Sequence, residues 1–265
     1  MSRRGFAPTG PLSLKGSGRQ RVLGYLRGRD CLVELLFAAI HFTSGMPARG
    51  EELRLIRWAN TPAAPRNIFV HNGMVMLVFS NNKAATNHND SIYIVRRPYP
   101  TVERILFTYL AYVRPFSDSL FRELSENYST SPNRHLYARH DWDSACFNSD
   151  ACLRCLQKST TDSPIPMTMR RYRRIAIALS KKHLPALVKP FDAHTPQDYG
   201  GFLQLLASQT GHKPSTHSSA YALETAFPAK LQPDLIRRDL ENSRVWHKFL
   251  LIGQEDVIEA AIDQS

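Results

Sequence analysis

One segment of the chain carries arginines at a spacing that suits the binding of a phosphate group. Apolar periodicity predicts a helix that starts near Met167. Residues three and four apart share a helix face, and one face carries Arg170, Arg173, Arg174 and Ile177. Two guanidinium groups on this face can share one target, because a planar guanidinium fork matches phosphate oxygens. Taken alone, the same cluster is also typical of a solvated basic face or a nuclear-import patch.

The whole chain is basic as well. Its 265 residues include 34 lysines and arginines against 23 aspartates and glutamates, a net charge of +11. Apolar residues make up 43% and charged residues 22%, near the average for globular domains, which argues against a disordered chain. An excess of positive charge attracts polyanions, and nucleic acid is the favoured partner. Composition does not separate DNA from RNA or acidic lipid.

Membrane insertion and secretion are not expected. A membrane span needs about 20 apolar residues, and the longest candidate, Cys31–Phe42, contains Glu34 and His41. No apolar segment follows the basic N-terminal residues, so a secretory signal is not indicated. Four cysteines in a chain of this length do not suggest a disulfide framework and fit a reducing compartment. We therefore expect a soluble protein.

Periodicity and turn signals predict a mainly α fold with a small antiparallel β-sheet, an α+β class. The dipeptide Asn72-Gly73 between two apolar runs is a strong hairpin signal. The expected helices cover residues 30–42, 51–58, 101 to about 114, and 167–179, and the expected strands cover residues 68–70, 74–79 and 92–95.

Composition also suggests how the chain is divided. Residues 1–28 are rich in Arg, Gly, Ser and Pro and are expected to form a basic flexible arm. The main domain is expected over residues 29–225, with an inserted polar, partly irregular segment at about 117–163. Residues 226–265 should form a helical tail, with Trp246, Phe249 and Leu250 as its apolar anchors.

The expected insertion contains the residues that could hold zinc. Cys152 and Cys155 form a Cys-x-x-Cys pair, with Cys146 and His140 nearby. The pattern lacks a second close ligand pair, and isolated cysteines in a reduced environment are mostly packing residues. Packing is therefore the favoured interpretation, and no metal is assigned.

Three segments, taken in order, resemble the boxes of the tyrosine recombinase (phage integrase-like, DNA breaking and rejoining) superfamily. They are Arg49–Trp58 (RGEELRLIRW), Thr168–Arg174 (TMRRYRR) and Gly211–Tyr221 (GHKPSTHSSAY). The nine-residue separation of His212 and Tyr221 is the usual spacing in the family. The sequence is similar in particular to the recombinase-like segments of Crypton-type transposons and of fungal telomere-linked helicase genes. The resemblance covers roughly residues 30 to 250.

The resemblance implies a catalytic set and a role for each member. Arg49 and Arg173 match the two family arginines that clamp the scissile phosphate, and Tyr221 matches the nucleophile that becomes joined to the 3′-phosphate. Lys83, beside the expected hairpin, would protonate the departing 5′-oxygen. His212 would hydrogen-bond a phosphate oxygen. Arg170 stands where the family usually has histidine.

The resemblance further implies a tyrosine recombinase catalytic-domain fold that needs no cofactor or metal. Duplex DNA is the implied partner, in recombination or integration of a mobile element. Family members assemble as synaptic tetramers, so self-association through the C-terminal helix is expected. The location would be nuclear in a eukaryote and cytoplasmic otherwise.

Two alternatives remain open at this point. Residues 1–28 are too few for the helical core-binding domain that precedes the catalytic domain in the family. This favours a fragment of a longer polypeptide, or a degenerate or domesticated DNA-binding module without turnover. A basic RNA-binding or structural protein with accidental motif matches is the other alternative. It would require Tyr221 to lie far from Arg49 and Arg173.

Overall fold

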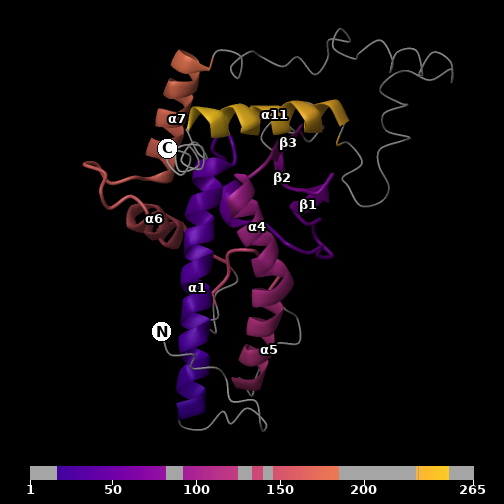
Figure 1. Cartoon of the computed structure of the whole chain (residues 1–265), viewed down its shortest axis with the longest axis vertical. Helices are drawn as coiled ribbons and strands as arrows, with labels where there is room; N and C mark the ends of the chain where they lie inside the picture. Colours follow the sequence, from indigo (N-terminus) through magenta and orange to yellow (C-terminus); the bar gives the residue numbers. More distant parts are fainter. Residues whose placement is uncertain are drawn as a thin grey trace, which may run out of the picture.

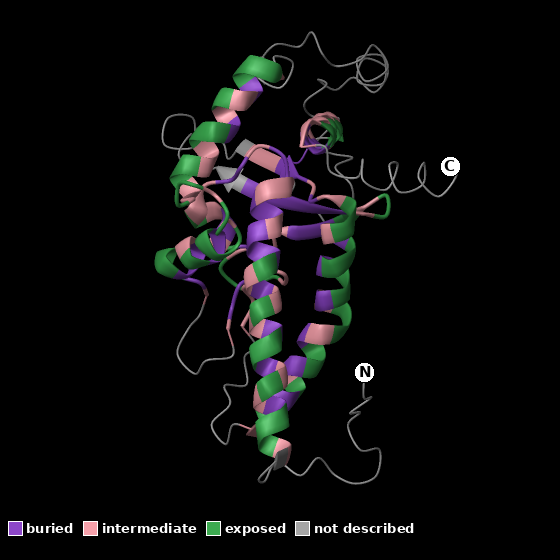
Figure 2. Ribbon diagram, turned by 60° about the vertical axis from the view of Figure 1, so that its left-hand side comes forward, coloured by how far each residue is buried: buried purple, intermediate pink, exposed green. Residues whose placement is uncertain are grey.

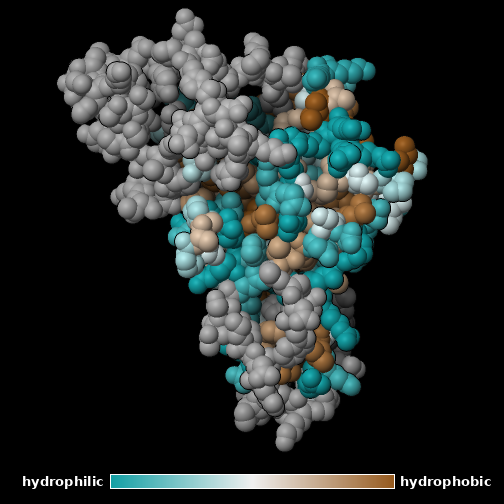
Figure 3. All heavy atoms as spheres, turned by 180° about the vertical axis from the view of Figure 1, so that it is seen from behind, coloured by the Kyte–Doolittle hydropathy of each residue, from teal (hydrophilic) through white to brown (hydrophobic). Residues whose placement is uncertain are grey.

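The structure is a computed structural model that describes residues 17–81, 92–124, 133–139, 146–184, 231 and 233–250. As predicted, it is mainly helical with a small three-stranded antiparallel sheet (Figure 1). In this described part of the chain, no helix has the length and apolar character that crossing a membrane requires. Hydrophilic side chains cover much of the coloured part of the face seen in Figure 3, with apolar patches between them.

The longest element is helix α1, Ser17–Thr43, which begins earlier than the sequence predicted. Residues 17–28 were expected to belong to a flexible arm, and this prediction was wrong. Val22 and Leu26, one turn apart, are buried and pack with Leu120 of a later helix. Val22, Tyr25 and Leu26 form only a short apolar pattern among arginines and glycines, and the composition of the segment favoured a flexible arm.

The sheet consists of β1 (Ile68–His71), β2 (Met74–Asn81) and β3 (Ile92–Arg96), in the order β1-β2-β3. The hairpin turn lies where it was predicted, and Asn72 and Gly73 both have positive φ, 50° and 75°. Two such residues give the turn a twist that matches the flanking strands. Alternate residues of the sheet enter two different cores, one against α1 and one against α11 (Pro233–Phe249).

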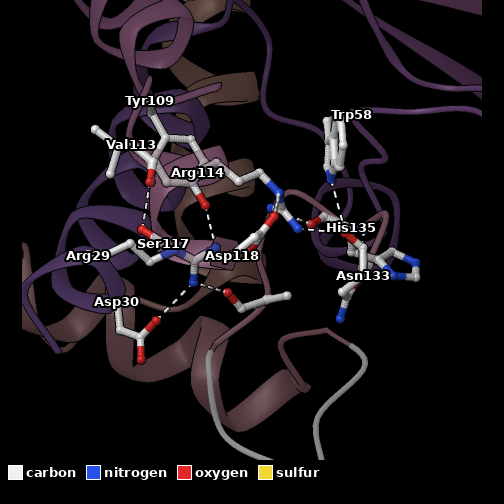
Figure 4. A network of polar contacts seen from close by, with 11 residues as sticks. Arg29, Asp30, Trp58, Tyr109, Val113, Arg114, Ser117, Asp118, Asn133 and His135 are labelled. Carbon is white, nitrogen blue, oxygen red and sulfur yellow. Dashed lines mark hydrogen bonds and ion pairs between the residues drawn. The ribbon is translucent and has the colours of Figure 1, made fainter. Parts of the chain in front are cut away.

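A second long rod runs beside α1 and joins α4 (Pro100–Thr108), the π-helical turn η1 (Tyr109–Val113) and α5 (Arg114–Leu124) (Figure 1). The sequence predicted that this helix ends near Arg114, but it continues for ten residues more. Buried Leu120 explains the difference, because it packs against Val22 and Leu26 of α1. Figure 4 shows the polar contacts of this junction, where buried Arg29 of α1 donates to the hydroxyl of Tyr109.

The segment expected to be a polar insertion at 117–163 contributes to the core where the structure describes it, at 117–124, 133–139 and 146–163. Leu136 and Tyr137 are fully buried, and α6 (Ser149–Lys158) packs on α1 through Cys152 and Leu156. Backbone hydrogen bonds bind the strip 133–139 to the chain after α2 (Gly50–Arg54), since the amide of Leu136 donates to the carbonyl of Ile56 at 2.8 Å. This pairing replaces the last turn of the helix predicted over residues 51–58. Figure 2 shows how much of this part of the chain is buried.

Helix α11 is also a component of this core rather than a free tail. Trp246 and Ile236 are buried, and Asp239 accepts a hydrogen bond from the amide of Val95 at 2.9 Å. The apolar face that the sequence offered for self-association is therefore covered by β3 and α1 of the same chain, at least over residues 233–249.

Candidate anion-binding site

Helix α7 (Met169–His183) and the turn between α1 and α2 form the two walls of a pocket of about 710 Å³, which we call the basic pocket. The turn supplies one guanidinium group and α7 supplies three. The lining residues are Ala48, Arg49, Gly50, Met169, Arg170, Arg173, Arg174 and Ile177. Three arginines predicted as site residues, Arg49, Arg170 and Arg173, therefore lie around one hollow, and Arg174 adds a fourth.

Arg49 is held by the local structure at the start of α2. It occupies the N-cap position, and its backbone amide donates to Oε2 of Glu52 at 3.1 Å. Its guanidinium Nη1 lies 3.5 Å from Oε1 of the same carboxylate, while 39% of its side chain stays exposed. Glu52 thus contacts both the backbone amide and the guanidinium of Arg49, and part of that guanidinium stays exposed at the pocket.

The turn before Arg49 depends on a glycine. Gly45 has a φ of 82°, a conformation that residues with a Cβ rarely adopt. A Cβ added there would also meet Oγ of Ser243 at 3.0 Å, because α11 passes close to the backbone. The close approach of α11 therefore helps to set the path of the chain from α1 to Arg49.

The other wall, α7, is fixed by its contacts with the end of α1. The hydroxyl of Tyr172 donates to the carbonyl of Phe42 at 3.0 Å, and their rings stand perpendicular with centroids 4.6 Å apart. Ala176 and Ser180 continue the buried side of the helix. Met169 packs against the main core cluster on this side and also lines the pocket, where it lies against Gly50.

A buried arginine that the sequence analysis missed stands behind the pocket. Arg96 is the last residue of β3, and its Nε donates to the carbonyl of Met46 at 2.8 Å. Burial lowers the pKa of Arg96 to about 10. The negative charges of Glu52 and Asp239 oppose this shift, whereas the positive charge of Arg173 lowers the pKa further. The sequence held a signal for this burial, because Arg96 ends a strand opposite Leu77, which is fully buried.

The charges around the pocket are poorly balanced. Among the described residues, Arg170, Arg173 and Arg174 have no ion-pair partner, and Glu52 is the carboxylate that pairs with Arg49. Four guanidinium groups around one hollow repel each other, and an anion placed between them would relieve that repulsion. The arrangement is chemically suited to hold a phosphate, because guanidinium donors match its oxygens.

The remaining members of the predicted catalytic set lie outside the described residues. Lys83 falls in the gap 82–91, and His212 and Tyr221 fall in the gap 185–230. Their placement relative to Arg49 and Arg173 therefore stays a prediction.

Two of the four cysteines occupy core positions. Cys152 and Cys155 are buried on α6, and burial raises their pKa values to about 12 and about 11. Cys146 lies 3.5 Å from a guanidinium nitrogen of Arg54, and His140 lies outside the described residues. Within the described ranges, no three His, Cys, Asp or Glu side chains are grouped so that they could hold a metal ion.

Comparisons with known proteins add no relative to this picture. No protein-family model, no curated protein and no solved structure matches the chain.

Proposed function

We propose that the basic pocket binds a backbone phosphate of duplex DNA, and that the chain is a tyrosine recombinase-like domain that cleaves and rejoins DNA through Tyr221. The observation that supports this most directly is the meeting of Arg49 and Arg173 at one pocket. The two residues come from segments far apart in the sequence, and the family resemblance assigns both of them to the scissile phosphate.

The electrostatics of the pocket favour an anion of high charge density. The lining residues carry four guanidinium groups, and buried Arg96 adds positive charge from behind. A phosphodiester brings one negative charge and two non-bridging oxygens that accept hydrogen bonds from a guanidinium fork. The overall charge of +11 further attracts the rest of the DNA backbone.

In the proposed reaction, the phenol of Tyr221 gives its proton to water, and its oxygen forms a bond to phosphorus while the bond between phosphorus and the 5′-oxygen breaks. Lys83 gives a proton to that departing oxygen, and His212 donates a hydrogen bond to a phosphate oxygen. Arg49 and Arg173 stabilise the charge that develops on the non-bridging oxygens. Loss of one such preorganised donor should raise the barrier by about 3 kcal/mol, which is roughly a hundredfold in rate.

A nicked duplex that loses its 5′ fragment after cleavage traps the covalent intermediate. We expect a pool of such duplexes with varied sequences to yield a protein–DNA adduct on denaturing gels. The adduct should be absent with Tyr221→Phe and form about a hundredfold more slowly with Arg173→Ala. An adduct that persists in Tyr221→Phe would overturn the assignment of the nucleophile.

One observation favours a second candidate, a DNA-binding module without turnover. Arginine keeps its proton in proteins, and the described lining of the pocket contains no side chain that exchanges protons near neutral pH. Arg170 occupies the position of the family histidine. This candidate predicts no adduct with the unmodified protein. It also predicts salt-sensitive DNA binding that Arg49→Ala and Arg173→Ala weaken and Tyr221→Phe leaves unchanged.

A further inference from the structure

The face of α7 that lines the basic pocket continues past it toward the end of the helix. Buried Ala176 and Ser180 mark the side that faces the core. The pocket-lining residues of α7 occupy the neighbouring sector. At about 100° per residue, Lys181 follows Ile177 by one turn and Arg174 by two, so it lies in that same sector.

The next residue lies in a different sector. Lys182 is rotated by about 100° from Lys181, toward the outer side of the helix that also carries Arg171. Both lysines are exposed. The chain therefore offers two adjacent lysines with equal charge and similar exposure, of which only Lys181 extends the pocket-lining face.

The helix dipole does not explain this difference. Basic residues in the last turn of a helix stabilise it, and Lys181, Lys182 and His183 all lie in the last turn of α7. His183 is engaged elsewhere, because its ring stacks on Phe249 with centroids 5.9 Å apart. The dipole favours Lys181 and Lys182 about equally, so it does not account for the position of Lys181 on the pocket-lining face.

We propose that Lys181 binds a second backbone phosphate of the same DNA whose phosphate occupies the basic pocket, so that α7 follows the DNA backbone. This inference rests on the proposed function and extends its binding surface. Lys181 lies about 12 Å along the helix axis from Arg173, at 1.5 Å per residue, which spans more than one nucleotide of a strand. No carboxylate among the described residues forms an ion pair with Lys181 that a phosphate would have to displace.

The test compares Lys181→Gln with Lys182→Gln in the full chain, using fluorescence anisotropy on a labelled duplex at several salt concentrations. We expect Lys181→Gln to reduce the slope of log K against log salt by about 0.9, and to weaken binding roughly five- to tenfold near 0.1 M salt. Lys182→Gln should leave the slope unchanged. Unfolding curves of the two variants should coincide, since the two charges interact similarly with the helix dipole.

Arg173→Ala separates failure of this inference from failure of the proposed function. If Arg173→Ala lowers the slope while the two lysine variants behave alike, the proposal for Lys181 is wrong and the pocket remains the binding site. If Arg173→Ala leaves both slope and affinity unchanged, the pocket does not bind DNA, and both proposals are overturned. A reduced slope for Arg173→Ala and Lys181→Gln, with Lys182→Gln unaffected, supports both.

Discussion

The hydroxyl of Tyr172 donates a hydrogen bond at 3.0 Å to the carbonyl of Phe42, the penultimate residue of α1. The indole Nε1 of Trp246 donates to the same carbonyl, also at 3.0 Å. The last carbonyls of a helix have no partner within it, so side chains of α7 and α11 complete the end of α1. The pocket wall formed by α7 is thereby attached to the longest helix of the fold.

Tyr172→Phe should therefore destabilise the protein. The substitution keeps the ring that packs against Phe42 and removes the hydroxyl, so we expect a loss of about 1 kcal/mol in the free energy of unfolding. Trp246 still satisfies the carbonyl, which keeps the loss small. Tyr112, which is 69% exposed, provides the matched control, because Tyr112→Phe should change stability by less than about 0.5 kcal/mol. Urea denaturation measures both, and equal values would contradict the structure.

His41 should make the protein sensitive to acid. It is 2% exposed, and burial, together with the charge of Arg96, lowers its pKa to about 3 from 6.5. Below pH 6.5 the unfolded chain takes up a proton that the folded chain does not, so stability falls as the pH drops toward 3. From this group alone we expect a loss on the order of 3 kcal/mol between pH 6.5 and 4.

His41→Phe isolates this contribution. Both nitrogens of His41 lack a hydrogen-bond partner among the described residues, and its ring lies among Phe37, Phe42 and Tyr172, so a phenyl ring suits the site. The variant should lose clearly less stability on acidification than the unmodified protein. Buried His247 contributes in both proteins and cancels from the difference. Parallel curves of unfolding free energy against pH would show that His41 is not the group responsible.

Sequence patterns within one segment were enough to predict the hairpin and the arginine-bearing face of α7. The hairpin over β1 and β2 follows from alternating apolar residues and from Asn72-Gly73, whose positive φ angles are a property of the turn itself. The face of α7 that carries Arg170, Arg173 and Arg174 follows from helical periodicity. Neither prediction required knowledge of the tertiary structure.

Features that depend on pairing between distant segments were missed. Leu136 and Tyr137 belong to no periodic run, and they are buried because their strip pairs with the chain after α2. Arg96 was overlooked for the same reason, since a charged side chain is buried only where distant groups such as the Met46 carbonyl receive it. Arg49 was found through the order of motifs, because nothing local distinguishes it from other arginines at helix starts.

The N-terminal part of α1 gives a direct test of the corrected boundary. Leu26 is 4% exposed and packs with Val22 and Leu120, so Leu26→Ala should cost about 2 to 4 kcal/mol of unfolding free energy. Leu35, which is 57% exposed on the same helix, is the control, and Leu35→Ala should cost less than about 0.5 kcal/mol. Thermal or chemical unfolding measures the difference. If Leu26→Ala is as mild as Leu35→Ala, residues 17–28 behave as the arm that the sequence suggested.

Thiol reactivity should distinguish a packing role for the cysteines from a zinc-binding role. Cys31 is exposed, whereas Cys152 and Cys155 are buried, with pKa values raised to about 12 and about 11. Because the thiolate is the reactive form, iodoacetamide near pH 8 should label Cys31 while Cys152 and Cys155 react only after denaturant is added. Mass spectrometry of peptides follows each site.

A zinc site would also protect cysteines from labelling, so metal analysis is the necessary companion measurement. Stoichiometric zinc, with labelling of Cys152 released by a chelator at native pH, would replace the packing interpretation with a metal-bound one.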